Sequence, residues 1–233
     1  MKVIRNFHLL CCGLAAAAVL GLSAATASAA TLSLWTFETT PPPTGAGPHL
    51  ASSGIFAATS AATVTTAGTV DNPAGNGSAE SLSSNNWNTG EYFQFTSSSL
   101  LYQDIIVSWD QTRSSTGPAT FDLAYSTDGI NFTTALNDYA VLLNGGAPNA
   151  SWSSVGGRQA AYTTTVDLSS IVGLDNAATL TFRLISQVSP AATGTSRVDN
   201  FLVEGSDLII PEPTTLALAG LGVIGILTAR RRG

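Results

Sequence analysis

The chain has 233 residues, a formal net charge of −6 and two cysteines. Both cysteines lie within the first 12 residues, whereas residues 30–210 contain no lysine, four arginines and every acidic residue except Glu212. This section therefore has no disulfide or thiol chemistry, and nucleic acid and anionic lipid are not expected partners, because nothing would neutralise phosphate.

The first 29 residues have the order of a secretory signal peptide. Two basic residues come first, an apolar run covers residues 9–22, and small residues follow, including Ala27 and Ala29. This order predicts export through the Sec translocon and cleavage after Ala29. The mature ectodomain would then begin at residue 30.

Two alternatives to a cleaved signal peptide remain open. Cys11 and Cys12 allow a lipoprotein signal, although Leu10 is large for the position before the cysteine and most of the apolar run follows it. An uncleaved N-terminal membrane anchor is the other alternative.

Residues 30–207 show no sustained helical period. Instead, short runs alternate apolar and polar residues, as half-buried strands do, and turn residues separate them. Asp128-Gly129 is a tight-turn dipeptide that predicts a hairpin. Weaker strands are expected near 63–70, and loops over 39–54 and 71–78. About nine clearer strands are predicted, over 31–38, 91–96, 102–110, 119–126, 130–134, 139–143, 161–168, 178–186 and 197–204.

The alternation on two of these strands predicts which side chains face the core. Many short strands with no helices between them predict an all-β fold in which antiparallel sheets pack as a β-sandwich. A jelly-roll-like arrangement fits better than an open sheet, whose edges would invite aggregation. The core-facing residues would be Ile105, Val107 and Trp109 on one strand, and Phe121, Leu123 and Tyr125 on the other.

The C-terminal section, residues 208–233, has three parts. Pro211-Glu212-Pro213 comes first, an uncharged run covers 214–229, and Arg230, Arg231 and Arg232 follow. As a transmembrane helix the run would be roughly 24 Å long, slightly short of the ~30 Å hydrocarbon core. The arginines should stay in the cytoplasm, which places the ectodomain outside. A buried core helix is the alternative interpretation.

The order of these three parts resembles the PEP-CTERM sorting signal of Gram-negative bacteria. The match covers the tripeptide, the apolar span and the terminal arginine cluster. It implies that an exosortase, a membrane enzyme similar to cysteine proteases, recognises Pro211, Glu212 and Pro213. It also implies a precursor tethered to the inner membrane and then passed to the cell surface or the extracellular polysaccharide.

A second resemblance covers most of 31–205. Its motifs are TFE at 36–38, RSSTGP at 113–118, YSTDGINFT at 125–133 and RVDNFLVEG at 197–205. They are similar to the ectodomains of PEP-CTERM proteins, which in turn resemble jelly-roll carbohydrate-binding modules. This resemblance implies a fold, and a fold alone does not carry a function.

Glu38 and Asp199 are candidate ligands of a structural calcium ion. The jelly-roll resemblance implies this role, because a Glu that ends the first strand and an Asp that opens the last one commonly supply ligands in such modules. Carboxylate oxygens are ligands that Ca²⁺ prefers. The alternative is a pair of surface carboxylates, one of them paired with Arg197.

Trp87 and Trp152 are candidate sugar-binding residues. Both lie in predicted loops and are flanked by Asn, Ser and Gly, whose polar groups bond readily to hydroxyls. An exposed indole could stack on a pyranose face. Trp35 and Trp109 lie in predicted strands instead, where packing in the core is expected.

The sequence shows no catalytic constellation. His49 is the one histidine after the leader, and it lies in a predicted loop. Arg183 is expected to lay its stem along a sheet and to pair its charged head with an acid. A glycoside hydrolase would need two carboxylates, which would come from Glu38, Glu80, Glu91, Asp104, Asp110 and Asp122.

The favoured interpretation is a non-enzymatic, exported protein of the cell surface or extracellular matrix. An exosortase would mature it, and it would act in surface or polysaccharide assembly. A carbohydrate-binding module is the alternative, and a secreted glycoside hydrolase is a third, weaker one.

Overall fold

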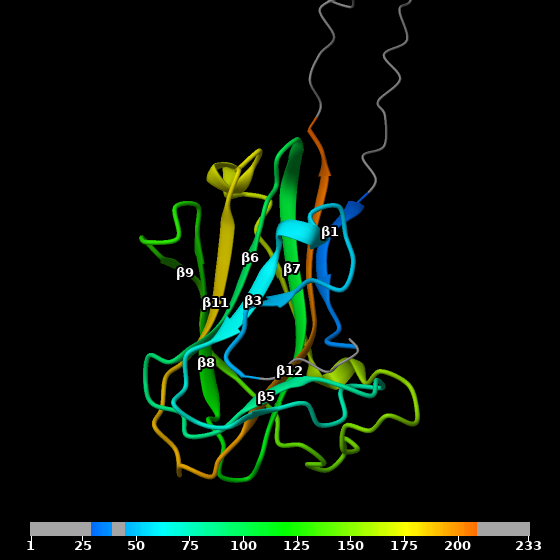
Figure 1. Cartoon of the computed structure of the whole chain (residues 1–233), viewed down its shortest axis with the longest axis vertical. Coiled ribbons are helices and arrows are strands. Elements are labelled where there is room, and N and C mark those ends of the chain that lie inside the picture. Colours follow the sequence, from blue (N-terminus) through cyan, green and yellow to red (C-terminus); the bar gives the residue numbers. More distant parts are fainter. Residues whose placement is uncertain (1–28, 39–44, 209–233) are drawn as a thin grey trace, which may run out of the picture.

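The computed structural model describes residues 29–38 and 45–208, which form two sheets packed face to face (Figure 1). The predicted signal peptide before Ala29 and the sorting segment after Leu208 lie outside the described residues. Within the described part, no helix has the length and apolarity needed to cross a membrane. Its helices are three short 3-10 turns: η1 (Ala57–Thr59), η2 (Ala160–Tyr162) and η3 (Val172–Leu174).

Each sheet has six strands, and every strand pair is antiparallel. The first sheet has the order β10 (Thr163–Asp167), β7 (Tyr102–Arg113), β12 (Ser196–Asp207), β5 (Leu82–Ser84) and β4 (Val70–Asp71). Its sixth strand, β1 (Ala29–Trp35), also pairs with β12. The second sheet has the order β2 (His49–Leu50), β3 (Ala61–Val64), β6 (Tyr92–Ser97), β11 (Leu180–Ser186), β8 (Thr120–Ser126) and β9 (Thr133–Ala140).

The strand order confirms the predicted all-β, antiparallel, jelly-roll-like sandwich. Eight strands pair as one long hairpin, β1 with β12, β6 with β11, β7 with β10 and β8 with β9. The hairpin is rolled so that β12 also pairs with β7, and β11 with β8. This is the connectivity of a jelly roll, and β2 to β5 are additions between its first two strands.

Three strands differ from the sequence prediction. β2 lies inside the predicted loop at 39–54, and β5 was not predicted at all. β9 extends to Ala140 and so merges two runs that the sequence separates. The first two are only two and three residues long, so no alternating pattern can develop in them.

Phe201 on β12 is the centre of the aromatic core. Its ring stacks on Phe95 at 3.6 Å between centroids, and Trp35 meets it edge-on at 5.8 Å. Trp109 and Phe182 lie 6.1 and 6.2 Å away. One side chain therefore contacts aromatic rings from four other strands in both sheets, which holds the sandwich together.

A bulge in β12 sets the position of Phe201. Asn200 has a φ of 50°, a left-handed conformation that Asn tolerates better than most residues. The pairing of β12 with β7 shifts between Asp199 and Leu202, so β12 carries one extra residue there. Because of this extra residue, Asp199 faces outward whereas Val198 before it and Phe201 after it face the core.

The predicted core faces of two strands are confirmed. Ile105, Val107 and Trp109 are fully buried. Phe121 and Leu123 are also buried, and Tyr125 packs against the same core while staying half-buried near the end of β8.

Candidate functional site

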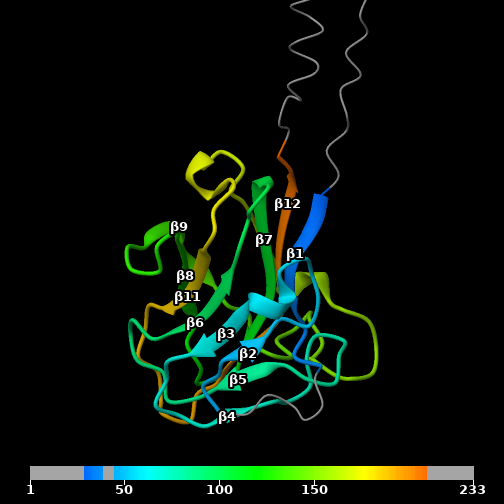
Figure 2. The same cartoon turned by 45° about the horizontal axis from the view of Figure 1, so that its top comes forward.

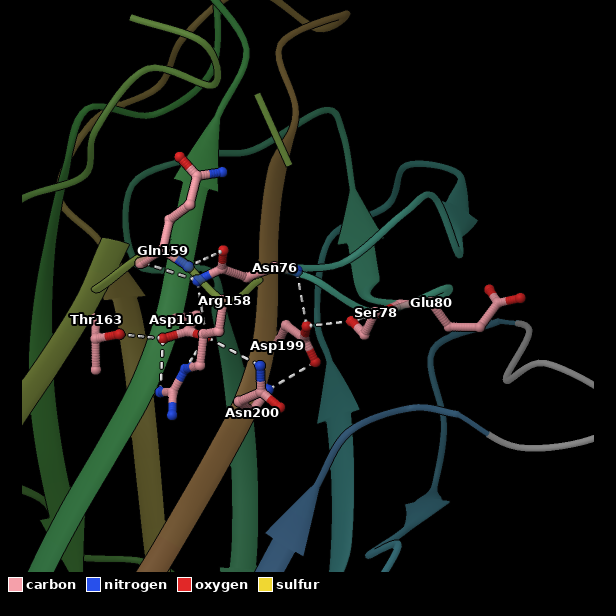
Figure 3. A network of polar contacts seen from close by, with 9 residues as sticks. All are labelled: Asn76, Ser78, Glu80, Asp110, Arg158, Gln159, Thr163, Asp199 and Asn200. Carbon is pink, nitrogen blue, oxygen red and sulfur yellow. Dashed lines mark hydrogen bonds and ion pairs between the residues drawn. The ribbon is translucent and has the colours of Figure 1, made fainter. Parts of the chain in front are cut away.

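A network of polar contacts lies on the outer face of the first sheet (Figure 3). Asp110 on β7 and Asp199 on β12 are directly opposite in register, and both are fully buried. Asp110 follows the core residue Trp109, so strand alternation turns it outward. Loop residues at 76–80 and 158–159 cover both acids. An outward acid is therefore buried here, which alternation alone does not predict.

Asp110 has a full set of donors. Arg158 contacts both carboxylate oxygens, from Nε at 2.7 Å and from Nη2 at 2.8 Å. Thr163 Oγ1 donates at 2.6 Å, Asn200 Nδ2 at 2.9 Å and Asn76 Nδ2 at 3.0 Å. The hydrogen bond to Asp110 raises the pKa of Arg158. The bidentate pair therefore fixes the loop before β10 onto the sheet, which is a structural role.

Asp199 has hydrogen bonds, but no described basic residue forms an ion pair with it. Its Oδ2 accepts from Asn76 N at 2.9 Å and from Ser78 Oγ at 2.7 Å, and its Oδ1 accepts from Asn200 N at 2.7 Å. Burial raises the pKa of Asp199 to about 6, and the nearby charge of Asp110 adds to the rise. Asp199 is thus a carboxyl that titrates close to neutral pH.

The segment 76–80 connects the two predicted calcium ligands. The Glu38 carboxylate accepts from Glu80 N at 2.5 Å, whereas Asp199 is bound at Asn76 and Ser78. The resemblance pairs Glu38 and Asp199 as ligands, and the structure attaches both to this one segment.

Gly75 packs closely against three oxygen atoms of this network. A Cβ on Gly75 would lie 2.1 Å from Ser78 Oγ, 2.2 Å from Glu80 O and 2.3 Å from Asp199 Oδ2, so no larger side chain fits there. Glu80 Oε2 is also buried without a hydrogen-bond partner among the described residues.

Two observations count against a preformed calcium site. Figure 3 shows the Glu80 carboxylate turned away from Asp199. Within residues 29–38 and 45–208, no three acidic, His or Cys side chains group as metal ligands. Calcium binding at Glu38 and Asp199 therefore stays a prediction, and it would require the donors on Asp199 to rearrange.

Trp87 is not the exposed residue that sugar stacking requires. It is only 1% exposed, and its Nε1 donates to Ser84 O at 2.8 Å. Its ring packs on Phe93 at 4.8 Å and on Phe121 at 5.5 Å. The polar neighbours in the sequence suggested a surface loop, but the large apolar area of the indole is buried under it.

Trp152 is also buried, with 5% exposure. It meets Tyr162 edge-on at 5.9 Å, and the Tyr162 hydroxyl donates to Ala150 O at 2.9 Å. The indole therefore anchors the loop between β9 and β10. The expectation that Trp87 and Trp152 are exposed is wrong for both.

A second cluster lies on the outer face of the second sheet. The Arg183 guanidinium carbon is 4.0 Å from the ring centroid of Tyr92 and 3.7 Å from that of Phe132. Arg183 Nε donates to Gln94 Oε1 at 2.8 Å. The head of Arg183 stacks between two rings, so the expectation that it pairs with an acid is wrong. Phe132 comes from the loop after β8, a contact that strand patterns do not reveal.

Ala29 begins β1 and pairs with Ser206, whereas Ala27 lies outside the described residues. The predicted sorting residues also lie outside the described residues: Pro211, Glu212, Pro213, Arg230, Arg231 and Arg232. His49 is 8% exposed, it contacts Gly45 O through Nε2 at 3.0 Å, and burial lowers its pKa.

Replacing Asp199 with Asn should remove a pH-dependent part of the free energy of unfolding. Asp199 holds its proton up to about pH 6 in the folded protein, but only to its ordinary pKa of 3.8 when unfolded. Between these values the folded state binds more protons, so ionisation of Asp199 lowers stability by about 3 kcal/mol as pH rises through this window. Urea unfolding of wild type and Asp199→Asn on both sides of the window measures this difference.

Asp207→Asn is the matched control, because Asp207 is an exposed acid on the same strand. The comparison concerns the pH slope and not the absolute stability, since an amide at position 199 would face one N–H donor unfavourably. An unchanged slope in Asp199→Asn would contradict the assignment.

Calcium is expected to raise the melting temperature of the ectodomain above its value in chelator. Glu38→Gln and Asp199→Asn should each abolish the difference, because each removes a charged ligand. The effect should fade below about pH 6, since protons compete with the ion for Asp199. Identical melting curves with calcium and with chelator would rule out the ion.

The described fold is similar to several solved structures, all at low TM-score. The family 11 carbohydrate-binding module of Lic26A-Cel5E from Clostridium thermocellum is 13% identical, with a TM-score of 0.41 over 81% of this chain and 100% of that one. The K1 adhesin domain of Lys-gingipain from Porphyromonas gingivalis W83 is 14% identical, with a TM-score of 0.40 over 62% and 90% of the two chains. The N-terminal cellulose-binding domain of β-1,4-glucanase C from Cellulomonas fimi is 14% identical, with a TM-score of 0.33 over 65% and 90%.

No curated protein matches the chain in sequence. Residues 210–232 match the family model of the PEP-CTERM protein-sorting motif. The chain thus carries a PEP-CTERM sorting motif, which indicates a secreted precursor that is anchored in the membrane and processed at the cell surface.

Proposed function

We propose that this chain is a non-enzymatic exported protein that an exosortase matures for the cell surface or the extracellular polysaccharide. The observation that carries the proposal is the place of the sorting motif. It covers 210–232, and β12 ends at Asp207, so the motif begins three residues after the last strand. The folded domain and the sorting signal are therefore adjacent without overlap.

The pairing of β1 with β12 supports this arrangement. Ala29 lies opposite Ser206, so the first described residue and the end of the fold are side by side (Figure 1). The leader and the sorting segment would both join the domain at this end. The rest of the domain would then extend away from the membrane during export and processing.

The surroundings of the acidic residues support a non-enzymatic role. Asp110 is buried beneath its donors and paired with Arg158. Asp122 accepts a hydrogen bond from Asp138 N at 2.7 Å, which places it in the β8–β9 pairing. A glycoside hydrolase would need two carboxyl groups facing a shared substrate.

Substitution of the PEP motif should stop processing. When the chain is expressed with an exosortase, Glu212→Ala and Pro213→Ala are each expected to leave the uncleaved precursor in the membrane fraction, whereas wild type is released. Glu204→Ala on β12 is the matched control and should be processed normally. Immunoblots of membrane and surface fractions measure the ratio, and normal processing of both PEP variants would contradict the proposal.

Carbohydrate binding by the outer face of the second sheet is the second candidate function. The observation that favours it is the stack of Tyr92, Arg183 and Phe132, in which all three side chains are half-buried. Within the described residues, the Nη groups of Arg183 donate no hydrogen bond, so they are free to donate to sugar hydroxyls. The rings beside them offer apolar faces and edges.

Arg183→Ala should therefore weaken binding to the cell's own exopolysaccharide several-fold. Arg183→Lys should weaken it too, because an ammonium group lacks the planar fork. Affinity electrophoresis in gels containing the polysaccharide measures the retardation. Arg197→Ala, on the other sheet, is the control, and a thermal melt checks folding. Unchanged retardation of a folded Arg183→Ala variant would exclude this face.

A further inference from the structure

Two exposed leucines occupy the turn between β6 and β7. Leu100 is 44% exposed and Leu101 is 63% exposed. Tyr102 N donates to Ser99 O at 2.8 Å, which closes a β-turn with the two leucines at its centre. Leu101 has a φ of 69°, where Gly or Asn is favoured and a bulky side chain is strained. Neither exposure nor backbone conformation favours leucine here, so its presence needs another reason.

The turn lies at the end of the molecule where the fold leads into the sorting segment. Leu208 N donates to Leu101 O at 2.8 Å, and Ser99 N donates to Ala177 O at 2.9 Å, just beyond η3. Val172 in η3 is 74% exposed. Both views show the turn, η3 and the end of β12 at one end (Figures 1 and 2). We call this the apolar tip, formed by Leu100, Leu101 and Val172.

Chain length limits how far the apolar tip can be from the membrane. The uncharged run of the sorting segment starts at Thr214, six residues after Leu208. Six residues span at most about 20 Å. Because Leu208 N is hydrogen-bonded to Leu101 O, Leu101 stays within about that distance of the point where the run would enter the bilayer. The headgroup layer fills part of the gap.

The charges beside the apolar tip are negative. Asp175 accepts from Asp104 N at 3.1 Å through Oδ1. Asp207 is exposed at the end of β12. Such a rim repels anionic headgroups, so a surface that accepts the tip must be close to neutral.

We propose that the apolar tip inserts into the interfacial layer of a zwitterionic bilayer while the precursor is anchored. This inference rests on the proposed function, because the anchor keeps the tip at the membrane. Three apolar side chains would bind a membrane only weakly from solution, but a short tether raises their effective concentration. Insertion holds the domain in one orientation and positions the nearby PEP motif at the bilayer surface.

Fluorescence quenching in nanodiscs tests the proposal. The full precursor, with Cys11→Ser and Cys12→Ser, is incorporated into phosphatidylcholine nanodiscs and labelled with a polarity-sensitive dye at Leu101→Cys. Nitroxide groups on the lipids, placed just below the headgroup, should quench this dye several-fold more than a dye at Val155→Cys. Val155 is 80% exposed. It lies in a loop in which Ser153 forms a β-bridge with Asn76, and Asn76 contacts Asp110 near the end of β7 that is remote from the tip. Addition of anionic phosphatidylglycerol should reduce the quenching.

A double variant, Leu100→Ser with Leu101→Gly, separates insertion from folding. Glycine suits the left-handed turn position, so the urea midpoint should be retained or raised. A dye at Val172→Cys should nevertheless lose most of its quenching in this variant.

The outcomes separate the two proposals. Equal quenching at positions 101 and 155 in incorporated protein overturns tip insertion alone. Failure of the precursor to incorporate overturns both insertion and the anchored-precursor function. If the double variant leaves quenching at 172 unchanged but slows exosortase cleavage, the tip contacts the enzyme and insertion is wrong.

Discussion

The extra residue in β12 is the constraint on which the rest of the structure depends. With Asn200 in a left-handed conformation, the in–out alternation of side chains along β12 shifts by one residue at this point. Phe201 enters the core and joins rings from both sheets, while Asp199 enters the polar network outside. A regular strand could satisfy one of these positions but not both, because side chains alternate with a period of two. The bulge thus couples the packing of the sandwich to the loops on its surface.

The fold class could be predicted because the long strands show clear alternation. β7 is the clearest case, since Ile105, Val107 and Trp109 are all inside. The short strands β2 and β5 could not be predicted, because two or three residues carry no period. Their positions depend on pairing with strands elsewhere in the chain, β2 with β3 and β5 with β12.

The candidate site, too, could be predicted from the sequence only in part. Glu38 and Asp199 were predicted as a pair, and the segment 76–80 does connect them. The pairing of Asp110 with Arg158, 48 residues away, left no signal in the sequence. Polar neighbours predict exposure for the two loop tryptophans, but both side chains are buried. In Trp87 the apolar area of the indole outweighs the polar loop around it, and the ring joins the core.

The pairing of β12 on both edges has a mechanical consequence. Near its end β12 is hydrogen-bonded to β7 on one side and to β1 on the other. A force applied to the chain beyond Asp207 would enter the domain at the end of β12 and run along the strand axis. The bonds on both edges then share the load in shear, instead of opening one after another from the strand end. The strand that leads into the sorting segment is therefore also the one best placed to keep the domain folded under tension.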